Sequence, residues 1–395
     1  MESKTILFVN GPIFHPERGG IERVTDILAR AFVSRGYKIL YLYQTDSEDG
    51  VLGYKYPAEL FKLPSTNYND TINIDFCERL IADKNIDIII NQAAHNPDIS
   101  RMFSNINRGI AKLLSVIHFN PKMSLDRLFR VAMSQPNRSA LDIVKKLFKI
   151  ATFPIYKSLR WKRLTTGYSY LSQCSDKVVL LSAEYISELK QVMPNIEDNK
   201  IGYIPNPNMY RTQNVDTYNR QKYLLFVGRL DNGQKRPDLL LKIWKRLAGE
   251  FLDWELVFVG DGPMRSILEQ QSISIPRVQF KGWQSPDLYY RNASIFCMTS
   301  MFEGLAMTLI EAMTYGVPVV AFQSFASITD IVEDGKNGYL IKPFNIDDYC
   351  EKLRLLMRQE QRRQELSKYA QESVTKFDIE IIVERWEQMF SDVTK

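Results

Sequence analysis

Short apolar runs alternate with amphipathic segments through the first half of the chain. The segment 21–34 places its apolar residues at helical spacing, and Gly36 suits the end of that helix. Strands that alternate with helices indicate a parallel sheet with helical crossovers, and thus an α/β fold. The apolar runs predict strands at 5–9, 38–43, 86–90, 113–117 and 177–181.

The same alternation restarts after a polar, proline-containing stretch at 206–220, which we interpret as a linker. Strands are predicted at 223–227, 255–259, 278–280, 295–298 and 317–321, and helices at 238–250, 264–271, 307–315 and within 347–395. We therefore expect an N-terminal domain at 1–205 and a C-terminal domain at 221–375. A last helix at 376–395 is expected to pack back on the N-terminal domain.

Composition agrees with two soluble domains. The chain has 395 residues, of which 45% are hydrophobic and 25% charged, so each half is long enough to bury its own core. Its four cysteines lie far apart without metal-ligand spacing, which favours a reduced compartment. No apolar run approaches the roughly 18 residues of a spanning helix, and the N-terminus is interpreted as a strand rather than a signal peptide. We expect a cytoplasmic protein.

Basic residues gather in one segment. Between Lys122 and Arg163 lie eleven lysines or arginines but only two acidic residues. On a helical projection of 141–150 the lysines fall on one side and the apolar residues on the other. This segment suits an anionic membrane surface on the inner face, or a lipid-diphosphate acceptor. The alternatives are a solvated helix and a helix that packs its apolar face on the N-terminal domain. No motif suggests nucleic acid as a partner.

Several unusual residues of the first half follow predicted strands. Gly19 and Gly20 lie after the first strand and open a helix, where free backbone N–H groups can meet an anion. His118 directly follows the strand at 113–117, and His95 is a weaker candidate after another strand. Because ligands of open α/β sheets bind at the carboxyl ends of the strands, these positions are candidates for a binding site.

The second half repeats this arrangement. Arg229 and Lys235 bracket a loop after a strand and could neutralise a diphosphate. Gly260 follows the next strand, and Glu303 lies just past the strand at 295–298. Glu311 falls on a polar stripe of the following helix, which would either face solvent or offer a carboxylate to sugar hydroxyls.

Several common catalytic signatures are absent from the sequence. The chain contains no Asp-x-Asp, no HExxH and no GxxxxGK[ST] phosphate loop, so no metal and no other cofactor are predicted. Neither His95 nor His118 belongs to a recognisable hydrolase motif with a serine or cysteine.

The order and spacing of five motifs resemble those of the family 4 retaining glycosyltransferases of GT-B fold, in particular those that build bacterial surface polysaccharides. The match is dense over about 223–345, and its most specific part is the Glu-x7-Glu element with a trailing Gly-x-Pro. The motifs are Gly-Gly-Ile-Glu-Arg-Val at 19–24, Phe-Val-Gly-Arg-Leu at 226–230 with a lysine shortly after, Val-Gly-Asp-Gly-Pro at 259–263, the segment 302–321, and the segment 330–341.

The resemblance implies two Rossmann-like domains whose parallel sheets face each other across a cleft, and it implies roles for individual residues. Arg229 and Lys235 would hold the donor diphosphate, Glu311 the ribose, and Glu303 the transferred sugar. His118 would face that sugar near the reacting carbon. The resemblance also implies that the backbone contacts the donor at further positions, namely Gly19, Gly20, Gly260, Gly304, Leu305, Ala306 and Met307.

The resemblance further implies a retaining transfer from a nucleotide-diphosphate sugar, a UDP-sugar or alternatively a GDP-sugar. The acceptor would be a glycan or a polyprenyl-diphosphate-linked saccharide. Two positions depart from the family pattern: Leu305-Ala306 stands where many relatives have Phe-Gly, and His118 lacks the acidic follower of some relatives. The alternatives are a nucleotide-sugar epimerase, a phosphorylase, and a degenerate relative that only binds glycans.

Overall fold

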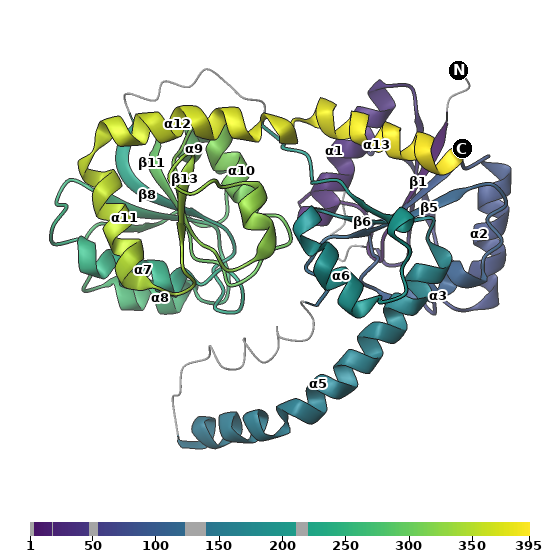
Figure 1. Cartoon of the computed structure of the whole chain (residues 1–395), viewed down its shortest axis with the longest axis horizontal. Coiled ribbons are helices and arrows are strands. Elements are labelled where there is room, and N and C mark those ends of the chain that lie inside the picture. Colours follow the sequence, from purple (N-terminus) through teal and green to yellow (C-terminus); the bar gives the residue numbers. More distant parts are fainter. Residues whose placement is uncertain (1–3, 18, 47–53, 123–139, 211–219) are drawn as a thin grey trace. The chain divides into compact units, whose positions relative to one another are not determined.

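The computed structural model describes residues 4–17, 19–46, 54–122, 140–210 and 220–395. It forms two compact units, which Figure 1 shows as two sheets with flanking helices. All four cysteines are buried and unpaired. Unit 1 comprises Met1–Leu125, Pro154–Pro207 and Ile379–Lys395, and unit 2 comprises Asp126–Phe153 and Asn208–Asp378.

Unit 1 is built on a seven-stranded sheet in the order β3-β2-β1-β4-β5-β6-β7, in which neighbouring strands run parallel. The order reverses between β1 and β4, so this sheet has its switch point there. The sequence did not predict β3 and β7, because one is a mostly exposed edge strand and the other has only three residues. The strands are β1 (Thr5–Val9), β2 (Lys38–Tyr43), β3 (Glu59–Lys62), β4 (Ile88–Asn91), β5 (Lys112–Ile117), β6 (Lys177–Leu180) and β7 (Ile201–Tyr203).

Helices cover both faces of this sheet. On one face, the core joins residues of β1, β2, β4 and β5 to apolar residues of α2 and α3. Elsewhere in the unit α13 lies along α1: the Phe390 ring is 5.6 Å from that of Phe32, and Arg35 pairs with Glu380 and Glu387 at 2.9 and 2.6 Å. The helices are α1 (Gly20–Ser34), α2 (Thr71–Asp83), α3 (Pro97–Asn105), α6 (Ile186–Val192) and α13 (Ile379–Thr394), with 3-10 turns at Ala183–Tyr185 and Asp198–Lys200.

The longest helix is α5 (Ala140–Cys174), drawn in teal in Figure 1, with Pro154 in its interior. Its last turns bury Tyr168, Leu171 and Cys174. Its first turns instead expose apolar side chains, namely those of Leu141, Val144, Leu147, Phe148 and Ile150. These turns are grouped with unit 2, so the expectation that the apolar face packs on the N-terminal domain stays a prediction. Residues 123–139 of the basic segment lie outside the described residues.

Unit 2 is built on a six-stranded parallel sheet in the order β10-β9-β8-β11-β12-β13. Its switch point lies between β8 and β11. Strand β13 was not predicted, although it lies inside the segment 330–341, one of the five motifs that carry the family resemblance. The strands are β8 (Gln221–Val227), β9 (Glu255–Val259), β10 (Val278–Phe280), β11 (Ala293–Met298), β12 (Val319–Phe322) and β13 (Gly338–Ile341).

The helices of unit 2 form two layers. The core on one face joins the strands to α7, α8 and α11, whereas α9, α10 and α12 belong to the other face. The helices are α7 (Pro237–Leu247), α8 (Arg265–Ser272), α9 (Asp287–Asn292), α10 (Met307–Thr314), α11 (Ile346–Arg358) and α12 (Glu360–Val374), with 3-10 turns at Ala326–Asp330 and Thr375–Phe377.

The predicted fold class, two α/β units with parallel sheets, is confirmed. Predicted element ends differ from the observed ones by at most three residues: the strand expected at 86–90 is Ile88–Asn91, and the helix expected at 238–250 is Pro237–Leu247. In the part of the chain that the structure describes, no helix is both long and apolar enough to cross a membrane.

Candidate active site

The loops after β8 and β11 meet at the switch point of the unit 2 sheet. Because β8 and β11 are neighbours in this sheet, their carboxyl ends bring the loop 228–236 beside the loop 299–306. The hydroxyl of Thr299 donates to the backbone carbonyl oxygens of Lys235 and Arg236. The backbone amide of Met301 donates to the carbonyl oxygen of Gln234. These bonds fix the cationic loop against the end of β11.

Glycines let the loops after β8 and β9 lie backbone against backbone. Gly260 has a φ of 130°, and a Cβ on it would lie 2.1 Å from the carbonyl oxygen of Gly228. Gly262 approaches Leu230 in the same way. Gly260, which the sequence suggested as a donor contact, therefore has a packing role that by itself requires glycine.

Lys235 and Glu303 form an ion pair across the switch point. The Lys235 Nζ lies 2.8 Å from Oε1 of Glu303, and Gln234 donates to Oε2 at 3.0 Å. Glu303 is only 6% exposed, so its carboxylate depends on these donors for compensation. The stem of Lys235 runs over Gly228, where a Cβ would lie 3.4 Å from the lysine Cε. The structure thus brings together two residues that the sequence suggested separately.

Arg229 differs from Lys235 in having a free side chain. It is exposed, and within the described residues its guanidinium makes no hydrogen bond or ion pair. It follows directly after Gly228, the residue under the Lys235 stem. A cation without a partner at the carboxyl end of a central strand is available to an anionic ligand.

The N-terminus of α10 adds backbone donors to the same edge. The helix begins at Met307 with Ala306 as its N-cap, and no side chain caps it. Gly304 and Leu305 precede it, and the carbonyl of Gly304 accepts a hydrogen bond from Ser327 at 2.7 Å. The hydroxyl of Thr308 in the first turn is buried and has no partner in the described part of the chain. An anion would satisfy these donors.

Glu311 is buried one turn further along α10. Its Oε2 accepts a hydrogen bond of 2.8 Å from the hydroxyl of Tyr290, a residue of α9. Thr314, on the same stripe, is also buried. The alternative of a solvent-facing stripe is therefore wrong, because Tyr290 and the packing of α12 against α10 cover it.

Two glycines open α1 at the switch point of the unit 1 sheet. The helix begins at Gly20, with Gly19 as an N-cap that offers no side chain. The Glu22 carboxylate lies over this turn, 2.8 Å from where a Cβ of Gly19 would lie, and accepts a 3.4 Å hydrogen bond from Asn10. The α1 amides therefore already have a carboxylate beside them.

His118 is buried at the end of β5. Its Nε2 lies 2.6 Å from the side-chain oxygen of Gln92, which follows β4, and its Nδ1 has no partner in the described chain. Burial and, as a smaller cause, the nearby His95 lower the pKa of His118 to about 3. A neutral His118 that donates through Nε2 keeps Nδ1 as a hydrogen-bond acceptor. His95 lies at the surface in the loop after β4.

Sequence reasoning missed the residues that hold the candidates in place. Gln234, Tyr290 and Gln92 each hydrogen-bond a predicted site residue that is distant in the sequence. Gln234 adjoins Lys235, which was the available signal, whereas nothing near Tyr290 pointed to Glu311. Within the described residues, no group of three or more His, Cys, Asp or Glu side chains is placed to hold a metal ion.

Replacing Lys235 by methionine is expected to lower the free energy of unfolding by about 3–5 kcal/mol, because Glu303 would keep a buried charge without its cation. Adding Glu303→Gln should restore much of that loss. Urea unfolding followed by circular dichroism measures both effects. A Lys235→Met protein as stable as wild type would contradict the structural role of the pair.

His118 is expected to make the protein sensitive to acid. Its pKa is about 3 in the folded chain and about 6.5 when unfolded, so its stability contribution is complete above pH 6.5 and is lost toward pH 3. Compared with the His118→Gln protein, the wild-type protein should lose up to about 1.4 kcal/mol of its free energy of unfolding for each pH unit below pH 6. Denaturant unfolding at several pH values tests this, and parallel losses in both proteins would refute it.

Comparison with known proteins agrees with this geometry. Residues 212–373 match the family model described as glycosyl transferases group 1. An uncharacterised glycosyltransferase of Haemophilus influenzae is 27% identical over 93% of this chain and 95% of its own length. An alpha-1,4-N-acetyl-D-galactosaminyltransferase of Campylobacter jejuni, named for a diNAcBac-PP-undecaprenol saccharide, is 28% identical over 45% of this chain and 50% of its own.

Solved structures show the same fold over the whole chain. The crystal structure of Anabaena HepE in complex with UDP-glucose has a TM-score of 0.70 at 17% identity, and the match covers 98% of this chain and 99% of that one. The chain is therefore a glycosyltransferase of GT-B fold, and its residues 212–373 match the model of the glycosyl transferases group 1.

Proposed function

We propose that this enzyme transfers a sugar from a nucleotide-diphosphate sugar, a UDP-sugar in preference to a GDP-sugar, with retention of anomeric configuration. The acceptor is a glycan or a lipid-linked saccharide of surface polysaccharide synthesis. The observation that carries the proposal is the buried Lys235–Glu303 pair at the β8–β11 switch point, beside Arg229, whose guanidinium has no partner among the described residues. Anabaena HepE, of the same fold, was crystallised with UDP-glucose, which supports a UDP-sugar.

The diphosphate is assigned to the cationic side of this edge. Arg229 supplies a free guanidinium, and the first turn of α10 supplies amides and the unpartnered Thr308 hydroxyl. Lys235 shares its charge between Glu303 and the arriving phosphate. Fixed donors of this kind stabilise the charge that grows on the leaving group, and losing one typically costs about 10²–10³-fold in rate.

Carboxylates are assigned to the hydroxyl groups of the donor. Glu303, which Lys235 and Gln234 hold at the sheet edge, is assigned to hydroxyl groups of the transferred sugar. Glu311, oriented by Tyr290, is assigned to the ribose. The neutral His118 is assigned to a sugar hydroxyl, from which Nδ1 would accept a hydrogen bond.

The proposed reaction breaks the bond between the anomeric carbon and the donor phosphate oxygen. A bond from the same carbon to the acceptor oxygen forms on the same face of the sugar. The acceptor's proton passes to the departing phosphate, so a protonated nucleoside diphosphate leaves. We propose that Arg229 and Lys235 neutralise the leaving group in place of a metal ion.

The acceptor side of the proposal rests on α5. Its first turns expose Leu141, Val144 and Phe148 together with Lys145 and Lys149. The side chain of Lys146 lies outside the described residues. An amphipathic basic helix suits the inner surface of an anionic membrane, and the C. jejuni relative is named for a PP-undecaprenol-linked substrate. We therefore favour peripheral membrane binding at the cytoplasmic face.

Arg229→Ala is expected to reduce turnover about 10²–10³-fold without loss of fold, because its guanidinium has no partner in the described chain. UDP release from a panel of UDP- and GDP-sugars, assayed in excess EDTA, measures this. Lys281→Ala is the matched control, since it removes another exposed cation at the end of a strand of the same sheet.

Near wild-type turnover by Arg229→Ala would refute the assignment of the diphosphate, and loss of wild-type turnover in EDTA with rescue by Mg²⁺ or Mn²⁺ would refute metal independence. The same assay separates the alternatives. A changed sugar without acceptor indicates an epimerase, dependence on inorganic phosphate indicates a phosphorylase, and no turnover at all indicates a glycan-binding relative.

Binding to anionic liposomes at low salt is expected to weaken when Lys145 and Lys149 become glutamine, by about 1 kcal/mol for each lysine. Vesicle co-sedimentation measures it. The control protein carries Lys242→Gln and Lys245→Gln, which remove the same charge from two exposed positions of α7. A wild-type protein that does not sediment with anionic vesicles at low salt would rule out the membrane proposal.

A further inference from the structure

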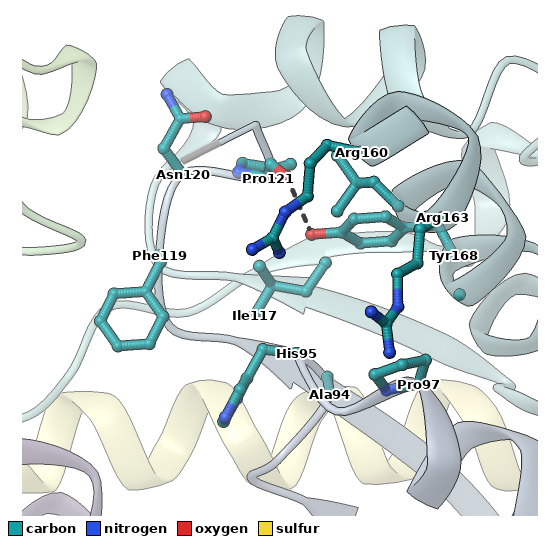
Figure 2. Close-up of a pocket in the computed structure, with 12 residues that line it drawn as sticks. Ala94, His95, Pro97, Ile117, Phe119, Asn120, Pro121, Arg160, Arg163 and Tyr168 are labelled. Carbon is teal, nitrogen blue, oxygen red and sulfur yellow. Dashed lines mark hydrogen bonds between the residues drawn. The ribbon is translucent and has the colours of Figure 1, made fainter. Parts of the chain in front are cut away.

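Unit 1 contains a cavity of about 180 Å³ between the ends of β4 and β5 and the second half of α5. Its walls are mostly apolar, including Ile117, Phe119 and Pro97. Figure 2 shows two arginines of α5, Arg160 and Arg163, reaching over these walls. Nothing in the assigned reaction uses these arginines.

The position of α5 over the cavity is fixed by close packing. A Cβ on Gly167 would lie 2.9 Å from the Cβ of Pro97, so glycine lets α5 approach the start of α3 closely. One residue further, the Tyr168 hydroxyl donates to the carbonyl of Pro121 at 3.2 Å, the dashed contact in Figure 2. These contacts hold α5, and with it the two arginines, above the cavity.

Both arginines lack an opposite charge. Arg160 uses Nε to donate to the hydroxyl of Tyr156 at 2.7 Å, and neither guanidinium forms an ion pair with a described carboxylate. The residues that line the cavity include no aspartate or glutamate. Two guanidinium groups at an apolar cavity, one of them half-buried, form a site for an anion with several oxygens, such as a phosphate or diphosphate.

A second cavity adjoins the first at His95 and Phe119, which line both. It measures about 370 Å³ and lies at the switch point of the unit 1 sheet, where ligands of such sheets bind. Its lining includes side-chain donors and acceptors from Asn10, Gln44 and Asn96. Amides and hydroxyls of this kind suit a saccharide.

An exposed apolar stripe of α5 leads to the arginines. Ile155 and Leu159 are 68% and 66% exposed, and they precede Arg163 by eight and four residues. That spacing places all three on one side of a helix. The cavity with amide side chains, the cavity with the two arginines and the apolar stripe therefore follow one another in the order of the parts of a lipid-linked saccharide.

We propose that unit 1 binds an acceptor in which a diphosphate joins a saccharide to a lipid. Arg160 and Arg163 bind the diphosphate, the cavity at the β1–β4 switch point takes the saccharide, and the α5 stripe receives the first part of the lipid. This inference rests on the proposed function and specifies its acceptor.

Isothermal titration of the full chain with farnesyl diphosphate, farnesol and inorganic pyrophosphate tests the inference. Farnesyl diphosphate should bind more tightly than either of the others. Replacing both Arg160 and Arg163 by glutamine should weaken its binding about tenfold or more, as expected for lost charge-assisted hydrogen bonds. Lys157→Gln with Lys162→Gln, on the same helix but outside the cavity lining, should leave binding unchanged.

Replacing Ile155 and Leu159 by glutamine should weaken the binding of farnesyl diphosphate but not that of pyrophosphate. Pyrophosphate that binds wild type as tightly as farnesyl diphosphate would overturn the lipid assignment and indicate a free phosphate or phosphorylated glycan. An equal loss in the lysine control would overturn the site, because it would indicate general charge attraction.

Two further titrations separate this inference from the proposed function. Arg229→Ala should leave the binding of farnesyl diphosphate unchanged, which excludes the donor site as its location. If wild type binds UDP but not farnesyl diphosphate, the inference is overturned and the proposed function stands. If wild type binds farnesyl diphosphate but not UDP, the proposed function fails instead.

Discussion

The buried carboxylate of Glu303 is the constraint on which the candidate active site depends. A carboxylate that is 6% exposed must have a cation and hydrogen-bond donors, and Lys235 and Gln234 supply them from the loop after β8. The pair ties that loop to the loop after β11, while the close approach of Gly228 and Gly260 leaves no room for side chains. Arg229 and the start of α10 are thereby placed at one sheet edge.

The two units use the same architecture for different chemistry. In unit 2 the switch point carries cations, helix amides and two buried glutamates, which suits a nucleotide-diphosphate sugar. In unit 1 the switch point carries amide side chains and the Glu22 carboxylate, and the cations come from α5, the long helix between β5 and β6. The proposed donor site therefore uses the strand ends and helix start of the unit 2 sheet, whereas the proposed acceptor site uses side chains of α5.

Much of the fold was predictable because buried parallel strands consist of apolar runs in the sequence. The helices between these runs indicate that neighbouring strands run parallel. Edge strands such as β3 and β7 carry no such run. Individual site residues were predictable from their places after strands, but the pairing of Lys235 with Glu303 joins loops 68 residues apart and exists only in the folded chain. The burial of Glu311 likewise depends on Tyr290, a residue of another helix. The cavity beneath Arg160 depends on the close approach of α5 and α3 at Gly167.

The central claim is that the edge formed by the β8 and β11 loops binds the diphosphate of the donor. Calorimetric titration of wild type and Arg229→Ala with UDP and with uridine tests it most directly, because the two ligands differ only in the diphosphate. UDP should bind far more tightly than uridine, and Arg229→Ala should weaken UDP about 10–150-fold, the range for one charged hydrogen bond, while leaving uridine unchanged. Equal binding of UDP and uridine to wild type, or an Arg229→Ala protein that binds UDP as wild type does, would contradict the account.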